Sequence, residues 1–384
     1  MIRYNLSPIR LVEKVRQFYL RPLVRCDRHN YFEPLNVTAK SLRSSTKGTL
    51  IMMRENTLQI LYIAGVGRSG STLLGDILGQ MPGMLHIGEL KSVFDYATLP
   101  DSVMPCSCGR PYSECSFWNP IFEAAFGRDW PIVFNDFSER NLPRTITLPF
   151  RALSQAIGRD LLEPGQRRTF TAIVSLLKII ADKHPDTIII DSSKSGAFGW
   201  ILAQQPGISL IAVHLIRDPR ATVFSWVNRP IPLMEPFGAK WRATIGTMDS
   251  KAAIHHWIRA NGSAWLMKWL GIPYMRIRYE SFVEDPAGSV ERILRFARQH
   301  GFAIPDNSDL LYQLREKRFY LGERHLIGAN PRVKSQRSEV QLREDIAWLC
   351  ETSWPKRLLW TIIFLPWLLW YGYSLWPRKR DSDR

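Results

Sequence analysis

The sequence predicts an α/β protein built in three layers, with a central parallel sheet and helices on both of its faces. Short apolar runs, typical of strands buried on both faces, recur along the chain with longer helical stretches between them. The first run leads through a glycine-rich turn directly into a helical pattern, as in folds that bind phosphate at a helix N-terminus. The strands are expected at Leu58–Ala64, Met84–Ile87, Asp186–Asp191, Ile208–Ile216 and Tyr274–Tyr279, and long helices at Arg167–Lys183 and Lys251–Leu270.

The turn after the first strand is the octapeptide Gly65-Val66-Gly67-Arg68-Ser69-Gly70-Ser71-Thr72. Backbone N–H groups in such a turn, together with the helix behind it, can hold a phosphate. The spacing is that of a Walker A box, except that Ser71 replaces its lysine. Because that lysine reaches the β- and γ-phosphates, its loss argues against hydrolysis of a nucleoside triphosphate. The loop therefore predicts a P-loop-like fold with Arg68 as its cation; an ordinary strand–helix turn is the alternative.

A second motif follows the apolar run Ile208–Ile216. The run ends in Arg217-Asp218-Pro219-Arg220, and Ser225 follows in the next expected helix. Ligands of open α/β sheets bind beyond the carboxyl ends of the strands, so Arg217 is expected in the ligand site. A guanidinium matches two phosphate oxygens at once, and a hydroxyl adds one donor. The alternative for Arg217 is a structural salt bridge with Asp218 or another neighbour.

Together, the loop and the R-D-P-R-x-x-x-x-S segment resemble the sulfotransferases that use 3′-phosphoadenosine 5′-phosphosulfate (PAPS) as donor. The resemblance spans about Thr57 to Glu351. It is closer to the carbohydrate, protein-tyrosine and bacterial branches than to the cytosolic small-molecule branch, whose Tyr-Pro-Lys opening of the loop is absent. It implies that the loop binds the 5′-phosphosulfate and that Arg217 and Ser225 hold the 3′-phosphate. The loop residues expected to contact PAPS are Gly67, Arg68, Ser69, Gly70, Ser71 and Thr72.

The resemblance also implies three catalytic candidates: Glu89, Lys194 and Arg68. Lys194 follows the strand Asp186–Asp191 and matches a lysine that contacts the bridging region of the phosphosulfate; a solvated lysine in a helix-capping loop is the alternative. Glu89 follows Met84–Ile87 and matches the glutamate that deprotonates the acceptor hydroxyl in protein-tyrosine sulfotransferases. His86 is a competing base of lower merit, because a buried structural histidine explains it as well.

Two later segments extend the resemblance. Tyr279 opens a Y-E-S-F-V-E-D-P segment similar to one whose tyrosine lies near the cofactor, although core packing would explain it equally. The stretch from His325 to Lys334 resembles a loop that closes over the adenosine, with Arg332 as its donor contact. Ala329 alters the pattern of that loop, so this correspondence is loose.

These motifs predict an enzyme, a PAPS-dependent sulfotransferase that acts on an acceptor hydroxyl, with a carbohydrate or a membrane-linked molecule as the first choice of acceptor. A P-loop kinase or NTPase is one alternative. A non-catalytic module that binds a nucleotide or a sulfated ligand at a membrane is the other.

The chain is strongly basic, with a formal net charge of +16. Part of this excess is local, because residues 1–50 hold ten Lys and Arg against three Asp and Glu. Such a charge suits an anionic cofactor, an anionic glycan or an acidic membrane surface. No nucleic-acid recognition motif accompanies it, so we expect no nucleic-acid partner.

Cys106, Cys108 and Cys115 lie close together in the sequence CSCGRPYSEC. Three thiols could join a zinc site, but no fourth ligand follows at the spacing of a zinc finger. A structural loop, with a pair of thiols able to oxidise, is the preferred interpretation. No metal is expected, since sulfuryl transfer in the family implied above needs none.

We expect three regions along the chain: a basic extension at 1–56, a sulfotransferase domain at 57–353 with an irregular insertion at about 102–164, and a tryptophan-rich tail at 354–384. The N-terminus has no pattern of a signal peptide, which predicts a cytoplasmic protein.

Leu358 to Trp376 is an uncharged run of 19 residues with four tryptophans and an interrupting Pro366. Its length and composition predict association with a membrane, as a span, a re-entrant hairpin or a helix in the headgroup region; a final helix pair packed on the core is the alternative.

Overall fold

The structure is a computed structural model that describes residues 57–99, 105–137, 142, 162–232, 244–245, 247–305, 308–328 and 338–377. The chain divides into two compact units, Met1–Asn56 and Thr57–Arg384. The first unit lies outside the described residues, so the fold below is that of the second.

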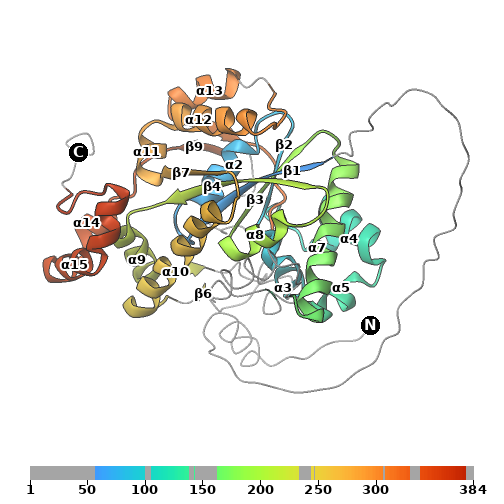
Figure 1. Ribbon diagram of the computed structural model, residues 1–384, viewed down its shortest axis with the longest axis horizontal. Coiled ribbons are helices and arrows are strands. Elements are labelled where there is room, and N and C mark those ends of the chain that lie inside the picture. The colour runs from blue at the N-terminus through green and yellow to red at the C-terminus, as the bar shows by residue number, and fades with distance from the viewer. Residues whose placement is uncertain are drawn as a thin grey trace, which may run out of the picture. The chain divides into compact units, whose positions relative to one another are not determined.

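The centre of this unit is a parallel sheet with the strand order β2-β3-β1-β4-β7 (Figure 1). β1 lies in the middle, between β3 and β4, and its residues are almost entirely buried. Five strands are hydrogen-bonded in this sheet among the described residues: β1 (Leu58–Gly65), β2 (Met84–Gly88), β3 (Ile188–Lys194), β4 (Ile208–Ile216) and β7 (Tyr274–Arg278). The predicted α/β class and parallel sheet are therefore confirmed.

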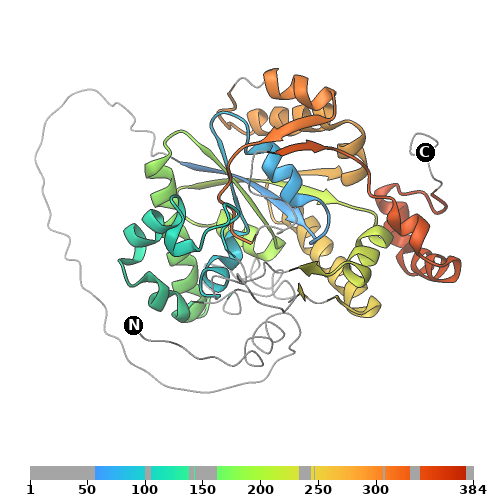
Figure 2. The same cartoon turned by 180° about the vertical axis from the view of Figure 1, so that it is seen from behind.

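Helices cover both faces of the sheet, as the pattern of the strands requires (Figures 1 and 2). On one face, Leu61 and Ile63 of β1 pack in one apolar cluster with α2 (Ser71–Leu78) and α12 (Pro286–Gln299). On the other face, Tyr62 of β1 packs on Phe198, with ring centroids 6.3 Å apart. The helices of that face include α7 (Pro164–Lys183), α8 (Gly196–Ala203) and α10 (Ser250–Trp269). Alternate residues of β1 therefore serve different layers.

Two elements differ from the prediction. β3 continues to Lys194, so Ser192 and Ser193 belong to the strand, and Ser195 rather than an earlier residue caps α8. The part of the insertion that the structure describes is also regular, with η2 (Tyr112–Glu114), α4 (Trp118–Phe126), α5 (Trp130–Val133) and η3 (Phe134–Asp136). Contacts between aromatic side chains stabilise these short helices. The rings of Phe122, Trp130 and Phe134 pack on one another at centroid distances of 4.8 to 4.9 Å.

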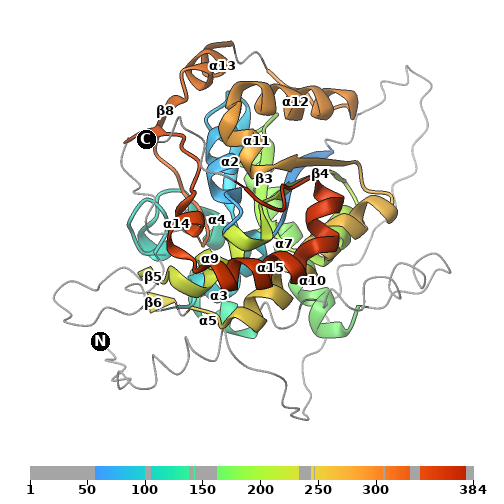
Figure 3. The same ribbon diagram turned by 90° about the vertical axis from the view of Figure 1, so that its left-hand side faces the viewer.

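The C-terminal apolar run forms α15 (Trp354–Tyr371), which continues through Pro366. One stripe of this helix, Trp360, Phe364, Leu368 and Tyr371, is buried in one apolar cluster with residues of α9 (Pro219–Asn228) and α10. Figure 3 shows α15 beside these two helices. Arg220 of α9 fastens it, because its buried guanidinium donates to Thr361 Oγ1 at 3.1 Å and to the carbonyls of Ser374 and Leu375. In the part of the chain described, no helix has both the length and the apolar character needed to cross a membrane.

Candidate functional site

The predicted site residues gather along the edge of the sheet where its parallel strands end. Going across the sheet, Glu89 follows β2, Lys194 ends β3, the glycine-rich loop follows β1, and Arg217 follows β4. Tyr279 follows β7 at the far side. The strand register keeps them level, since Lys194 is paired with Ala64 and Leu215 with Gly65. Strand order alone therefore sets the order of the functional groups along this edge.

The loop between β1 and α2 has the backbone of a phosphate-binding turn. Gly70 caps α2 with a φ of 87°, in the left-handed region that favours glycine. Its carbonyl accepts the first helical hydrogen bond, from Leu74 N–H at 3.0 Å. Arg68 also has a positive φ, of 68°. Residues with such a φ, alternating with ordinary ones, can turn backbone N–H groups toward one concave side of a loop, which is a site for an anion.

Two aromatic rings hold the loop from either side. A Cβ on Gly67 would lie 2.7 Å from the ring of Trp226, and one on Gly70 would lie 2.7 Å from the ring of Tyr279. Trp226 also donates from Nε1 to the carbonyl of Gly67 at 3.2 Å. The glycines are needed because larger residues would displace these rings.

Ser69 supplies evidence that the loop is built for a ligand. Its side chain is buried, and its Oγ has no hydrogen-bond partner within the described residues. A buried hydroxyl without a partner is costly, so it is expected to bond to something that the protein itself does not provide. Phosphate or sulfate oxygens at the concave side of the loop fit this hydroxyl.

Arg68 and Arg217 are connected through the loop backbone. Arg68 lies over Trp226, 5.0 Å from the ring centroid, and donates from Nη2 to the carbonyl of Arg229 at 2.8 Å. Arg217 donates from Nη1 to the carbonyl of Arg68 at 3.0 Å and lies over Tyr279, 4.6 Å from its centroid. The guanidinium groups of Arg68 and Arg217 are thus fixed beside the loop, and Arg68 also contacts the backbone of Arg229.

Asp345 is the carboxylate that pairs with this cluster. Its Oδ2 accepts from Arg229 Nη1 at 2.6 Å and from Arg217 Nη2 at 3.1 Å. Although burial acts in the opposite direction, the two guanidiniums hold the pKa of Asp345 below its ordinary value. Arg217 therefore forms a salt bridge, but with Asp345 and not with Asp218.

The rest of the R-D-P-R motif is structural. Asp218 caps α9 by accepting from Arg220 N–H at 2.8 Å, and its other oxygen pairs with the Arg220 guanidinium at 2.7 Å. Ser225 lies on α9, and its carbonyl accepts from Arg229 N–H. The two arginines of the motif therefore have different contacts. Arg217 donates to the loop backbone, whereas Arg220 donates to Thr361 of α15.

Glu89 and Lys194, 105 positions apart in sequence, meet at the other side of the loop. Lys194 donates from Nζ to Glu89 Oε1 at 2.5 Å and to the carbonyl of Ser192 at 2.9 Å. Both side chains are largely buried, at 14% and 25% exposure. Lys194 is not a solvated lysine of a capping loop, because it is the last residue of β3 and its side chain is paired with Glu89 and only 14% exposed.

Asp191 stabilises the backbone next to this pair through hydrogen bonds. Its Oδ1 accepts from Ser193 N–H at 2.8 Å and from Ser193 Oγ, which in turn accepts from Lys91 N–H at 2.9 Å. The carboxyl group is fully buried, and burial raises its pKa to about 7 despite these hydrogen bonds and the Lys194 charge. One buried acid therefore helps to hold the chain just before Lys194 and just after Glu89.

His86 is a structural residue and is not placed as a base. Its Nδ1 lies 3.0 Å from Asp76 Oδ1 and its Nε2 lies 3.0 Å from Ser192 Oγ, so both ring nitrogens have partners. Asp76 also accepts from Arg324 Nη1 at 2.6 Å through its other oxygen. This buried chain joins α2, β2 and β3 below the site.

Three residues near the site carried no sequence signal: Arg229, Asp345 and His256. His256 lies on α10 with its ring edge against Trp226, at a centroid distance of 5.4 Å. Burial, with the nearby charges of Lys91, Arg259 and Lys194, lowers its pKa to about 4, so it is neutral at pH 7. Arg332, the remaining predicted donor contact, lies outside the described residues.

Comparison with known proteins gives a match to one family model. A model of the sulfotransferase family matches residues 162–300, a range that includes Lys194, Arg217, Ser225 and Tyr279. No curated protein matches the sequence.

Solved structures of sulfotransferases give weaker likenesses. Sulfotransferase STF9 from Mycobacterium avium is 13% identical and has a TM-score of 0.36, over 68% of this chain and 67% of its own. STF1 from Mycobacterium tuberculosis H37Rv is 14% identical with a TM-score of 0.36, over 67% and 70%. A sulfotransferase from Alicyclobacillus acidocaldarius is 15% identical with a TM-score of 0.31, over 67% and 89%. The match to the sulfotransferase family model covers part of the chain, 139 of its 384 residues.

Proposed function

We propose that this protein transfers a sulfuryl group from PAPS to an acceptor hydroxyl. The observation that carries the proposal is the order of groups along the sheet edge: Glu89 and Lys194 on one side of the loop, Arg217 and Arg229 on the other. PAPS carries a phosphosulfate at one end of its ribose and a phosphate at the other. A central anion site flanked by a reactive pair and by an arginine cluster suits a donor with these two anionic groups.

In this proposal the loop N–H groups, Ser71, Thr72 and Arg68 hold the 5′-phosphosulfate. Arg217 and Ser225 hold the 3′-phosphate, with Arg229 beside them. The contacts of Asp345 support this placement, because its carboxylate accepts from both Arg217 and Arg229, as phosphate oxygens would. Tyr279 supports the guanidinium of Arg217 from one face.

The reaction is a displacement at sulfur. Glu89 accepts the proton of the acceptor hydroxyl while the acceptor oxygen forms a bond to sulfur. The bond from sulfur to the bridging oxygen breaks, and its electron pair stays on the departing 5′-phosphate. Lys194 Nζ, which now bonds to Glu89 at 2.5 Å, donates to that oxygen as its negative charge grows. The products are the sulfated acceptor and 3′,5′-ADP.

The experiment that tests the proposal measures transfer of labelled sulfate from PAPS into extract fractions that contain candidate acceptors. Labelling by the wild-type protein and its loss in Glu89→Gln would support the proposal. A protein that labels no fraction but binds 3′,5′-ADP would instead be the non-catalytic module. Preference for ATP with Mg²⁺ over 3′,5′-ADP would indicate a P-loop kinase or NTPase.

For the acceptor, we propose a carbohydrate or a membrane-linked molecule, presented to a cytoplasmic enzyme at a membrane surface. The outward stripe of α15 supports this, since it exposes Leu359, Ile362, Leu369 and Trp370, each at 55% or more. Trp370 lies beside Trp265 of α10, at a centroid distance of 6.1 Å, so the apolar surface extends beyond α15. Flotation with anionic vesicles tests this part: binding that survives Ile362→Ser with Leu369→Ser would exclude it.

A further inference from the structure

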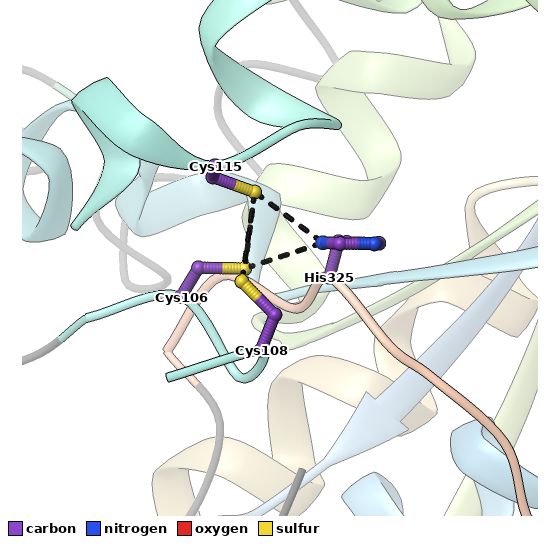
Figure 4. Close-up of side chains that lie close together, drawn as sticks. All are labelled: Cys106, Cys108, Cys115 and His325. Atoms are coloured by element: carbon purple, nitrogen blue, oxygen red, sulfur yellow. Dashed lines mark hydrogen bonds between the residues drawn. The ribbon is translucent and has the colours of Figure 1, made fainter. Parts of the chain in front are cut away.

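Four potential metal ligands from two distant segments meet outside the proposed donor site. Cys106, Cys108 and Cys115 come from the insertion, and His325 comes from the segment after β8 (Arg318–Leu321), as Figure 4 shows. Their ligand atoms all lie within 4.8 Å of one another. The sequence spacing shows three of these ligands, whereas the fourth follows 210 positions after Cys115 and is found only in the fold.

The separations match the edges of a zinc tetrahedron. Cys115 Sγ lies 3.6 Å from Cys106 Sγ and 3.8 Å from Cys108 Sγ. His325 Nδ1 lies 3.3 Å from Cys115 Sγ and 3.9 Å from Cys106 Sγ. With ordinary zinc–sulfur and zinc–nitrogen bonds, tetrahedral geometry requires about 3.8 Å between two sulfurs and about 3.6 Å between sulfur and nitrogen. We propose that these four residues bind one structural Zn²⁺ ion.

The surroundings of the cluster are those of a metal site. Gly109, with a φ of 84°, turns the chain back so that its N–H bonds to the carbonyl of Cys106 at 2.8 Å, which places the first two thiols together. Trp118 N–H points to Cys115 Sγ at 3.4 Å. His325 has a carboxylate behind it, with Glu323 Oε1 3.5 Å from Nε2. A carboxylate on the second ring nitrogen is the usual outer partner of a metal-bound histidine.

Zinc suits this donor set, and its role is structural. Three thiolates with one imidazole favour zinc over the harder cations, and four protein ligands leave no open position for a substrate. The three thiols are free, and their sulfurs are separated by well over the length of a disulfide bond, about 2.05 Å. A histidine ligand also has no part in a disulfide, so the cluster as a whole points to a metal.

The ion would join the insertion to a segment that pairs with the end of β2. Ile327 N–H donates to the carbonyl of Ile87 at 3.0 Å, and Glu89 N–H donates to the carbonyl of Ile327 at 2.9 Å. Ser107 Oγ donates to the carbonyl of Arg324 at 2.7 Å, which connects the same two segments beside the cluster. The metal would therefore help to hold the backbone of Glu89, a consequence that bears on catalysis only if the proposed function holds.

Metal analysis of the full chain tests the site directly. Protein purified from zinc-supplemented cells without chelators should hold about one zinc ion per chain, because sites of this type retain zinc through purification. Cys115→Ser and His325→Ala should each lose most of it, whereas the matched control Cys350→Ser, an exposed thiol outside the cluster, should keep it. Zinc-free wild-type protein, equal zinc in all variants, or a disulfide among the three thiols would overturn the proposal.

Two further measurements keep the test decisive if a variant fails to fold. Wild-type protein loaded with Co²⁺ should show the intense visible bands of tetrahedral cobalt with thiolate ligands; their absence would contradict the site. Hydrogen exchange should report the link to β2: removing zinc from the wild type should speed exchange in peptides that contain Ile327 and Glu89, but not in β4. Faster exchange confined to residues 105–118 would exclude the link.

Discussion

At the residue scale, the site depends on pairs of side chains that differ in their neighbours. Arg217 and Arg220 are three positions apart in one motif, yet one faces the phosphate loop and the other is buried under α15. Glu89 and His86 show the same contrast, because Glu89 pairs with Lys194 whereas both nitrogens of His86 are already occupied. Each contrast separates a residue of the proposed site from a structural residue of the same segment.

Glu89→Gln is expected to lower kcat by about 100-fold or more, since an amide cannot accept the acceptor proton. Binding of 3′,5′-ADP should stay within about twofold of wild type, because in the proposed mechanism Glu89 contacts the acceptor and not the nucleotide. Steady-state kinetics with calorimetric titration of 3′,5′-ADP separates the two effects. Normal turnover in this variant would remove the role of Glu89.

Arg217→Ala is expected to weaken binding of 3′,5′-ADP by about 10- to 100-fold, the loss of a charge-assisted bidentate contact. Arg295→Ala is the control, because Arg295 is an exposed arginine of α12 at 63% exposure. Calorimetry of both variants is the measurement. Equal affinities of the two variants for the nucleotide would place the 3′-phosphate elsewhere.

Asp191 predicts a specific dependence of stability on pH. Its folded pKa of about 7 lies above the ordinary 3.8, so the folded state binds a proton that the unfolded state releases between these values. Its contribution to stability is thus fully present below pH 4 and is lost as the pH rises through 7. Asp191→Asn should therefore gain stability relative to wild type from pH 4 to 7 and no further above it. Urea unfolding of both proteins across that pH range checks this. A difference in their free energies of unfolding that does not change with pH would contradict it.

At the scale of elements, the sequence predicted the strands of the sheet better than it predicted the end of β3 and the helices of the insertion. The strands β1 and β4 are recognisable because strands buried on both faces are almost continuously apolar. The strand β7 is recognisable by the alternation of its sequence, YMRIR. The end of β3 was missed because Ser192, Ser193 and Lys194 are polar residues in a strand that continues into the site. In the insertion, α4 and α5 are short and held by contacts between aromatic rings, which no local pattern reveals.

In the site, too, local sequence patterns reveal the residues that strands position but not those that tertiary contacts bring in. The loop, Arg217, Lys194 and Glu89 follow strands, so topology brings them to one edge and sequence could place them there. Asp345 and His325 come from irregular segments, and only tertiary contacts carry them to Arg217 and to the three thiols. The apolar run at the C-terminus was ambiguous for a physical reason, because a helix with one buried stripe and one exposed apolar stripe has the composition of a membrane segment.

The docking of α15 gives a prediction at this scale. Trp360 is buried to 1% exposure beside Phe364, so Trp360→Ala should lower the free energy of unfolding by about 3 to 5 kcal/mol. Leu359→Ala, next to it on the exposed stripe, should cost about 0.5 kcal/mol or less. Thermal and urea unfolding of the two variants provide the comparison. A near-neutral Trp360→Ala would mean that α15 is not part of the folded core.

At the scale of the whole molecule, one edge of the sheet collects cations from separate elements. The basic net charge of +16 is consistent with this, and the arginine cluster at Arg68, Arg217 and Arg229 focuses part of it beside the loop. The family match covers β3 and β4, the strands on either side of β1, but it does not cover the loop that follows β1. The proposal that this loop binds phosphate therefore depends on its geometry.

A crystal structure of the protein soaked with 3′,5′-ADP tests this arrangement most directly. We predict the 5′-phosphate on the N–H groups of residues 67–72 and the 3′-phosphate on Arg217 and Ser225, with Asp345 moved off the guanidinium. A nucleotide bound away from the loop, or bound with its two phosphates reversed, would contradict the account.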